Sequence, residues 1–336
     1  MTRVAEERFD ETLLREVLAR AFSSSAFRVA VVSRQRLKRG VLRLSLEVDG
    51  VPHAVIAKRV APAVAVRNRT VVERWLPAEG LAGLAPALLG VLPEADATWL
   101  VSEDFGTRTL ESSRADWTRV EAAVVQIAEL HRRFADHPLL AECRLWGGDL
   151  GMPFHDANVR DALRAVRALM RVPGLHGERL ELCRHLEGRL VRVQEDAPRR
   201  AALLARAGGP ETLLHGDLWL TNVVEVPRPG GFDMRLIDWD HAAVGPPAYD
   251  VSTLLQRFEP ADRRRVWADY RAAFGEGAWR FPDEDELASL AEWAEHARIA
   301  SRVIWPALAA LRGEEWAWEE LSIVESWFAD LRPLFA

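Results

Sequence analysis

Cysteine, long apolar runs and an apolar leader are all scarce or missing in this chain. The two cysteines, Cys143 and Cys183, are too few for a disulfide framework or a thiolate zinc site, and we expect both to be core thiols. No uninterrupted apolar run approaches the roughly 18 residues of a membrane span. Residues 1–10 contain three acids and no apolar segment. The sequence therefore predicts a cytoplasmic protein without a membrane partner.

An excess of basic charge is also missing. The net charge is −6, and the chain is 49% hydrophobic and 28% charged, as is usual for folded proteins. A nucleic-acid partner favours a clustered basic surface, so we expect no nucleic-acid partner. With 336 residues the chain is long enough for two lobes with separate cores.

Lysine is the scarcest charged residue: of the 44 lysines and arginines, only Lys38 and Lys58 are lysines. Alternating apolar residues predict a strand at 41–48, Asp49-Gly50 predicts a hairpin turn, and a second strand follows at 51–60. Lys58 lies near the end of that second strand. A compact ammonium group on a strand predicted to be buried indicates a specific role, whereas a lysine that protects an edge strand from aggregation is the alternative.

The stretch 213–250 contains polar residues whose spacing needs a chemical explanation. Asp217 precedes Asn222 by five positions, and the apolar runs 223–226 and 234–237 flank a Pro/Gly-rich turn, which predicts a hairpin followed by Asp238. An antiparallel pair places Asn222 beside Asp238. Carboxylate and amide oxygens suit Mg²⁺, and a further carboxylate can take the proton of an attacking hydroxyl. The stretch therefore predicts a metal-dependent site.

Protein kinases have the same order of residues: an Asp, then an Asn after four intervening residues, then a hairpin and a second Asp. The segment His215 to Asn222, together with Ile237 to Trp239 and Gly245 to Asp250, resembles the aminoglycoside phosphotransferase and choline kinase family more closely. A hairpin with solvated acids would explain either motif alone, but it does not explain both in order. Trp219 is similar to the corresponding residue of the fructosamine kinase branch.

The resemblance implies an α/β (α+β), bilobal, protein-kinase-like fold. It implies a small antiparallel-sheet nucleotide-binding lobe at residues 1–101, a hinge at 102–106, and a larger helical catalytic and substrate-binding lobe at 107–336. ATP and Mg²⁺ are the implied cofactors. Asp217 would be the catalytic base, with Asn222 and Asp238 as metal ligands.

The same resemblance implies the nucleotide-binding residues. Lys58 would hold the phosphates, and Glu73 would orient it; Glu79 is the alternative, although Pro77 and Gly80 interrupt the helix around it. The nucleotide base would lie against the hinge segment of Glu103, Asp104 and Phe105. The basic turn 34–40 has one glycine, so a protein-kinase glycine loop is absent, and its bases either contact phosphates or form a solvated hairpin tip.

Residues around the two motifs receive supporting roles. His215, Trp239 and Asp250 match the family motifs, and we expect them to fix the loop. We expect Asp240 to lie at the surface. Gly216 stands where protein kinases carry an arginine that answers a phosphate, so control by such a phosphate is not expected.

Apolar spacing predicts amphipathic helices along most of the remaining chain. Asp116 is the expected N-cap of one of them. The helix at 283–312 is expected to be interrupted near Pro306. The loop 145–155 is either a packed connection or a flap over the substrate. Helices are expected at 6–22, 116–134, 161–170, 177–195, 251–258, 262–274, 283–312 and 314–331.

The predicted activity is transfer of the γ-phosphoryl group of ATP to a hydroxyl of a small molecule. Residues 283–325 contain 11 acids and three arginines. Walls of one sign concentrate ligands of the opposite sign, which favours a cationic acceptor such as an aminoglycoside-like antibiotic or an amino alcohol. Acids that complement the start of a helix or face solvent are the alternative explanation. A fructosamine-kinase-like enzyme acting on a neutral metabolite or sugar, and a non-catalytic nucleotide-binding relative, are the alternative functions.

Overall fold

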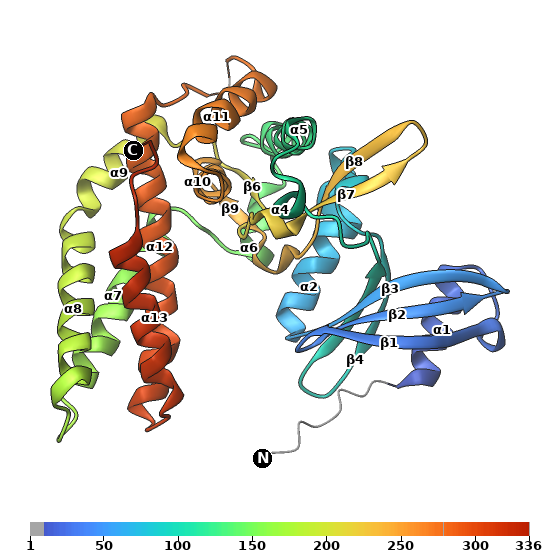
Figure 1. The fold of residues 1–336 in the computed structure, drawn as a ribbon, viewed down its shortest axis with the longest axis horizontal. Coiled ribbons are helices and arrows are strands. Elements are labelled where there is room, and N and C mark those ends of the chain that lie inside the picture. Colours follow the sequence, from blue (N-terminus) through green and yellow to red (C-terminus); the bar gives the residue numbers. More distant parts are fainter. Residues whose placement is uncertain (1–9, 278, 336) are drawn as a thin grey trace. The chain divides into compact units, whose positions relative to one another are not determined.

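The structure, a computed structural model, describes residues 10–277 and 279–335. It divides into two compact units: residues up to Gln126 with 220–242, and residues 127–219 with those from Ala243 onward. The predicted α/β class is confirmed by a five-stranded antiparallel sheet and a mainly helical remainder (Figure 1). The predicted lobes met at 101–106, whereas here the first unit extends further and includes the segment 220–242.

The sheet of the first unit has the strand order β1-β2-β3-β5-β4. β2 and β3 have the predicted bounds because an alternating apolar pattern and an Asp-Gly turn define both ends. β4 was not predicted, since its apolar run does not alternate. The strands are β1 (Val29–Lys38), β2 (Val41–Val48), β3 (Val51–Val60), β4 (Leu88–Pro93) and β5 (Thr98–Glu103).

Helix α1 (Glu11–Ala21) covers one face of this sheet (Figure 1). Leu14 and Leu18 of α1 are fully buried against Leu44, Val55 and other inward residues of the strands. Because side chains alternate along a strand, the neighbours of these residues face the opposite side of the sheet. The expected helix began near Glu6; residues 6–9 lie outside the described residues, and Asp10 caps α1 through the amides of Thr12 and Leu13.

The rest of the first unit follows the sheet and then returns as a hairpin. A π-helical turn (Val71–Trp75) joins two of its helices. Asp116 accepts a hydrogen bond from Thr118 N (3.1 Å) at the start of α5, as predicted for an N-cap. The elements are α2 (Pro62–Thr70), α3 (Leu76–Ala78), α4 (Leu110–Ser113), α5 (Trp117–Arg133), which continues into the second unit, β7 (Val223–Arg228) and β8 (Gly231–Leu236).

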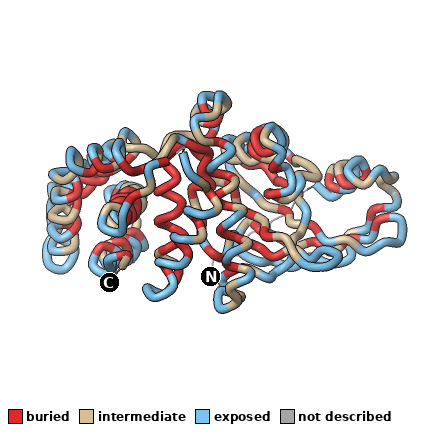
Figure 2. Tube along the Cα trace, turned by 90° about the horizontal axis from the view of Figure 1, so that it is seen from above, coloured by how far each residue is buried: buried red, intermediate tan, exposed pale blue. Residues whose placement is uncertain are grey.

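The second unit is a group of helices around a two-stranded antiparallel pair. Its main core is formed by α7, α8, α12 and α13. Buried residues follow one side of these helices and exposed residues the other (Figure 2). The elements are α6 (Leu140–Gly147), α7 (Met152–Met170), α8 (Gly177–Glu195), α9 (Ala197–Ala207), β6 (Thr212–Leu214), β9 (Ala243–Gly245), α10 (Ala248–Gln256), α11 (Pro260–Phe274), α12 (Glu284–Leu311) and α13 (Trp316–Asp330).

Two predictions about these helices were wrong. α12 continues through Pro306 without interruption, because its packing against α7, α10 and α13 outweighs the loss of one backbone hydrogen bond. α7 begins at Met152 instead of Asp161, so most of the predicted loop 145–155 is helical. Both cysteines are buried as predicted, and burial raises the pKa of Cys143 to about 12. Among the described helices, none is long and apolar enough to cross a membrane.

Candidate functional site

The first unit contains a cavity of about 360 Å³ between the open face of the sheet and the β7–β8 segment. Its lining combines apolar side chains with a few polar groups, as is typical of small-molecule sites. Six of the eight predicted site residues line it: Lys58, Glu103, Asp104, Phe105, Asn222 and Asp238.

Lys58 projects into this cavity from β3. The strand lies between β2 and β5, so the edge-lysine alternative is wrong. The ammonium group contacts Asp238 Oδ1 at 2.5 Å and Asp240 Oδ1 at 2.7 Å, and the side chain is 19% exposed. Lys38, at the end of β1, reaches Asp238 Oδ2 at 3.5 Å. Both lysines of the chain therefore contact the same carboxylate.

Two sequence predictions about Lys58 differ from the geometry. Glu73 forms an ion pair with Arg69 (2.7 Å) one helical turn away, so the expected contact with Lys58 is not made. Asp240, predicted to be a surface residue, is instead half-buried: it contacts Lys58 and accepts a hydrogen bond from Asn68 Nδ2 (3.0 Å). Asp240 thus holds the lysine in the way expected of Glu73. The π-helical turn that contains Glu73 could not be foreseen from apolar spacing.

Asn222 and Asp238 flank the hairpin as predicted. The register pairs Val223 with Leu236, and Ile237 N donates to Asn222 O (2.9 Å) just beyond that pair. Asp238 has φ 67° and ψ 58°, a left-handed conformation that Asp and Asn tolerate better than most residues. Buried Trp239 anchors the next position, because its Nε1 donates to Leu236 O (3.1 Å).

The segment after β5 also lines the cavity. Asp104 is nearly buried and forms an ion pair with Arg43 Nε (2.6 Å), while its Oδ1 accepts from Gly106 N (2.8 Å). Glu103 exchanges backbone and side-chain hydrogen bonds with Ala87. The carboxylates of the predicted hinge therefore shape the segment, which leaves apolar surface from Leu88, Leu100 and their neighbours for a flat ring.

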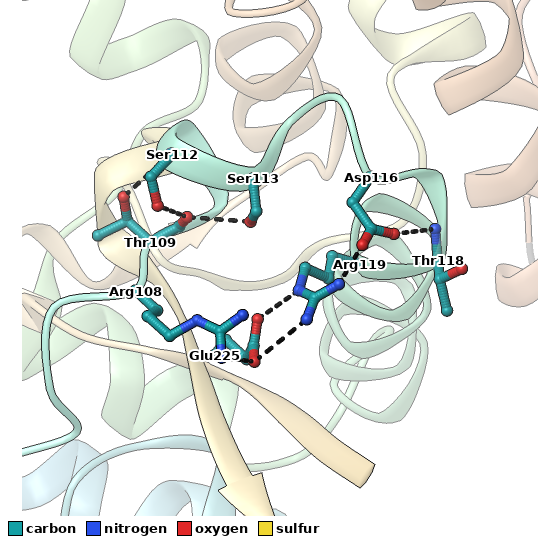
Figure 3. A network of polar contacts seen from close by, with 8 residues as sticks. All are labelled: Arg108, Thr109, Ser112, Ser113, Asp116, Thr118, Arg119 and Glu225. Carbon is teal, nitrogen blue, oxygen red and sulfur yellow. Dashed lines mark hydrogen bonds and ion pairs between the residues drawn. The ribbon is translucent and has the colours of Figure 1, made fainter.

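Buried Glu225 ties the hairpin to this segment (Figure 3). Its carboxylate accepts from Arg108 Nη1 (2.9 Å) and from Arg119, and its own N–H donates to Arg108 O (2.8 Å). A buried carboxylate without its cationic partners would be costly, so these contacts fix the hairpin. Sequence spacing gave no indication of it, because Arg108 and Glu225 lie far apart in the chain.

The loop with Asp217 belongs to the second unit and follows β6. Fully buried Asp250, at the start of α10, accepts hydrogen bonds from His215 N (2.6 Å) and Gly216 N (3.0 Å). His131 Nε2 lies 3.3 Å from the same carboxylate, and His131 Nδ1 lies 2.8 Å from the Tyr270 hydroxyl. The predicted role of Asp250 in fixing the loop is confirmed.

Charge interactions keep Asp250 ionised despite its burial. Burial raises the pKa of this carboxyl, but the hydrogen bond and charge of His131, with further help from His215, outweigh it, so the pKa lies below its ordinary value. An ionised carboxylate accepts only, which matches the two backbone N–H groups it receives. Asp250 is therefore a permanent anchor for the backbone that precedes Asp217.

Asp217 itself lines a second cavity, of about 380 Å³, formed entirely by the second unit. Trp219 Nε1 donates to Asp217 Oδ1 (2.7 Å), and the guanidinium of Arg257 lies 3.5 Å from the centre of the Trp219 ring. The unusual tryptophan of the loop thus holds the carboxylate and forms part of the cavity wall.

The acidic wall expected from residues 283–325 is largely neutralised. Glu295 is the single acid of that stretch among the described residues that line the Asp217 cavity, and it is paired with Arg298. Asp283 caps α12 in a capping box. Seven of the 11 acids form ion pairs with arginines: Glu284, Glu286, Glu292, Glu295, Glu314, Glu315 and Glu325. Charge in this stretch therefore gives no support to a cationic acceptor.

Comparison with known proteins agrees with this geometry. A profile of the Phosphotransferase enzyme family matches residues 56–293, a range that contains Lys58, Asp217, Asn222 and Asp238. The chain belongs to this family. The predictions of an aminoglycoside phosphotransferase relative and of a phosphotransferase acting on an alcohol group agree with that membership. A comparison with curated protein sequences gave no significant match.

Solved structures show the same fold at low sequence identity. An aminoglycoside phosphotransferase from Streptomyces rimosus, in complex with ADP and streptomycin, is 20% identical, with a TM-score of 0.54 over 87% of this chain and 99% of its own. An ethanolamine kinase from Plasmodium vivax is 12% identical, with a TM-score of 0.58 over 91% and 82%. A choline kinase from Cryptosporidium parvum is 11% identical, with a TM-score of 0.57 over 95% and 94%. These likenesses establish the kinase-like fold.

Proposed function

We propose that the chain transfers the γ-phosphoryl group of ATP to a hydroxyl group of a small molecule. The observation that carries the proposal is one cavity of the first unit, which Lys58, Asn222 and Asp238 line together with the segment after β5. The relative solved with ADP supports a nucleotide as the phosphoryl donor. Phosphoryl transfer depends on positioning and charge neutralisation more than on covalent chemistry, which suits such a site.

The residues of this cavity fit Mg²⁺. Asp238 and Asn222 offer a carboxylate and an amide oxygen. Among the described residues, no group of three or more His, Cys, Asp or Glu is placed to hold a metal ion by itself. Mg²⁺ typically takes one or two protein oxygens, with water and phosphate oxygens as its other ligands. When bound, it would neutralise negative charge on the nucleotide phosphates.

Lys58 would bind those phosphates from the sheet. Asp240 and Asp238 both hold its ammonium group in the cavity, and Asp240 would keep it in place with Asp238 as a metal ligand. Lys38, at the more exposed tip of β1, would add a second positive charge. This favours the phosphate-binding alternative for the basic turn 34–40.

Asp217 would act on the acceptor. Its carboxylate orients the hydroxyl and takes the proton, the hydroxyl oxygen forms the bond to phosphorus, and ADP leaves. Asp250 holds the loop through two backbone N–H groups, and Trp219 holds the carboxylate, so the base is positioned before the acceptor binds. A preorganised base supports a catalytic enzyme over the non-catalytic alternative.

The class of acceptor has three candidates. The structural relatives act on aminoglycosides, ethanolamine and choline by name, which favours a hydroxylated amine, including an antibiotic. The arginines around Asp217 instead favour an acceptor with negative charge. A neutral sugar, as in a fructosamine-kinase-like enzyme, would need neither an acidic nor a basic wall.

Two matched substitutions test the proposed roles. Asp217→Asn should lower kcat at least about 100-fold and leave Mg-ATP affinity unchanged, because it removes the proton acceptor alone. Asp238→Asn keeps the left-handed backbone accessible but removes the metal-binding charge, so Mg-dependent ATP binding should weaken at least about tenfold. Calorimetry with and without Mg²⁺ and an ADP-release assay measure both effects.

Asp161→Asn, an exposed change on α7, is the control and should leave both properties unchanged. Wild-type turnover in Asp217→Asn would refute its role as the base. Undiminished Mg-ATP affinity in Asp238→Asn would refute the metal site.

A further inference from the structure

The cavity around Asp217 has a charge that does not match the substrates named for the structural relatives. Five arginines line it against three carboxylates, Asp217, Glu295 and Asp330. The formal excess is two positive charges in a chain whose net charge is −6. The arginines of the cavity are Arg257, Arg263, Arg298, Arg302 and Arg332.

Two of these arginines have their charge available for a ligand. Arg302 on α12 and Arg332 after α13 are exposed, and within residues 10–277 and 279–335 neither forms a hydrogen bond or an ion pair. A surface arginine usually finds a carboxylate in this chain, as the many ion pairs of α8, α12 and α13 show. Arg302 and Arg332 therefore keep guanidinium donors available to a ligand in this cavity.

A third arginine, Arg263, adds positive charge to the cavity, because its N–H groups are hydrogen-bonded to neutral carbonyl oxygens and, among the described residues, not to a carboxylate. Buried Arg263 donates to the backbone oxygens of Phe258 (3.0 Å), Leu334 (2.8 Å) and Pro333 (3.4 Å). Carbonyl oxygens are dipoles and do not cancel a unit charge. Burial lowers the pKa of Arg263, while the negative charge of Glu259 raises it, and an arginine with its very high ordinary pKa stays protonated.

The carboxylates of the cavity do not offset this charge. Glu295 is ion-paired with Arg298, whose guanidinium also donates to Thr253. Asp217 is held by Trp219 and is the proposed base. Asp330 alone remains to balance Arg302 and Arg332.

The neighbouring cavity of the same unit, about 620 Å³, extends the positive surface. It shares Arg332 and Gln256 with the Asp217 cavity. Its wall adds Arg192, which has no ion-pair partner among the residues described. Arginine's planar fork binds carboxylate and phosphate with two parallel hydrogen bonds, which makes it the side chain suited to such oxyanions.

We propose that the acceptor carries an oxyanion, a carboxylate or a phosphate ester, in addition to the hydroxyl that receives the phosphoryl group. This inference rests on the proposed function of Asp217. Arg302 and Arg332 bind the oxyanion, while Trp219 and Trp327 form aromatic walls beside it. A volume of about 380 Å³ suits a molecule of sugar-acid size.

Matched series of acceptors test this proposal. One series is glycerol, glycerate, glycerol 3-phosphate and 3-amino-1,2-propanediol; the other is glucose, glucuronate, glucose 6-phosphate and glucosamine. Binding is measured by calorimetry with Mg-ADP present to fill the nucleotide site, and turnover by ADP release. The anionic members should bind at least about tenfold more tightly than the neutral and cationic members of the same series. Carboxylate and phosphate members distinguish the two oxyanions.

Arginine variants connect the preference to the cavity. Arg302→Gln and Arg332→Gln should each raise KM for the anionic members about tenfold, and raise it for the neutral members of the same series by less than about threefold. Arg184→Gln, an exposed change on α8 outside the cavity, is the control.

The possible outcomes separate this proposal from the proposed function. Tighter binding or faster turnover of neutral or ammonium-bearing members overturns the oxyanion inference and leaves the phosphotransferase intact. Failure of every anionic member to bind overturns it as well. Binding of the anionic members without turnover of any alcohol supports the oxyanion site and contradicts the proposed catalytic role.

Discussion

Lys58 lies between two carboxylates, and the room around its ammonium group is limited. Its distances of 2.5 Å to Asp238 and 2.7 Å to Asp240, with the side chain 19% exposed, leave little space for a wider group. A guanidinium keeps the charge but spreads it over a planar fork on a different stem. The position therefore tests shape separately from charge.

Lys58→Arg should reduce kcat/KM for ATP at least about tenfold although the positive charge is kept. The same substitution at Lys38 is the matched control. The Lys38 side chain is 66% exposed, and its ammonium group makes a loose contact of 3.5 Å with Asp238, so an arginine can be accommodated there. Lys38→Arg should therefore change kcat/KM for ATP less than about threefold. ADP-release kinetics measure both. Equal activity of Lys58→Arg and wild type would contradict a specific phosphate contact.

Residue types revealed the chemistry of the site better than they revealed its contacts. His215 to Asn222 and Ile237 to Trp239 predicted the acids and the amide because the motif fixes residue type and spacing together. Asp240 was missed, because its pairing with Lys58 joins residues about 180 positions apart and leaves no local pattern. Glu73 was chosen by position along a helix, and a local partner, Arg69, satisfies it instead.

At the scale of the element, α7 carries a buried histidine in an apolar setting. His155 is 1% exposed, and neither ring nitrogen has a hydrogen-bond partner in the described part of the chain. Burial, together with the charge of Arg200, lowers its pKa to about 4. Below the ordinary value of about 6.5, the unfolded chain takes up a proton that the folded chain does not. The stability contributed at this position is therefore lost as the pH falls from about 6.5 towards 4.

His155→Leu changes the free energy of unfolding by some amount at each pH. This change should be about 2 kcal/mol more favourable to folding at pH 4.5 than at pH 7.5, because the mutation removes the proton uptake of the unfolded state. Urea denaturation at the two pH values measures the difference. His185→Leu, on the exposed side of α8, is the control for losing a histidine that faces solvent. A pH profile parallel to that of wild type would contradict the buried neutral histidine.

Helices were predicted well where one face is apolar and where capping residues, glycine or proline indicate the ends. α8 has the predicted bounds, and α11, α12 and α13 differ by at most two residues at each end. α9 was missed, because its apolar residues are few between arginines and alanines. The arginine partners of Glu284, Glu292 and Glu315 come from other helices, so the charge of a single stretch was misleading.

At the scale of the whole molecule, the two cavities belong to different compact units. The first unit holds the nucleotide-side cavity, and the second holds the cavity of Asp217. The predicted boundary followed the chain, whereas the units follow packing, and the segment 220–242 returns to the first unit through β7, β8 and Glu225. Such a return is a long-range contact that sequence periodicity does not report.

Mg-ADP should therefore slow amide hydrogen exchange mainly in the first unit. Protection is expected in residues 102–106, 221–224 and 237–239, which line the cavity, with little change in the core of α7, α8 and α12. Mass spectrometry of exchanged peptides measures this pattern, and Asp238→Asn should weaken it at the same Mg-ADP concentration. Protection concentrated in the second unit would contradict the assignment of the nucleotide cavity.

The scarcity of lysine has a practical consequence for chemical labelling. Both ε-amino groups of the chain, Lys38 and Lys58, line one cavity and contact one carboxylate. A reagent that acylates lysine thus has no side chain to modify except at this cavity, and the two differ in access, with 66% and 19% of their side chains exposed. The extent of acylation at each lysine becomes a direct readout of what fills the cavity, and enzymatic lysine acetylation would act on the same two atoms.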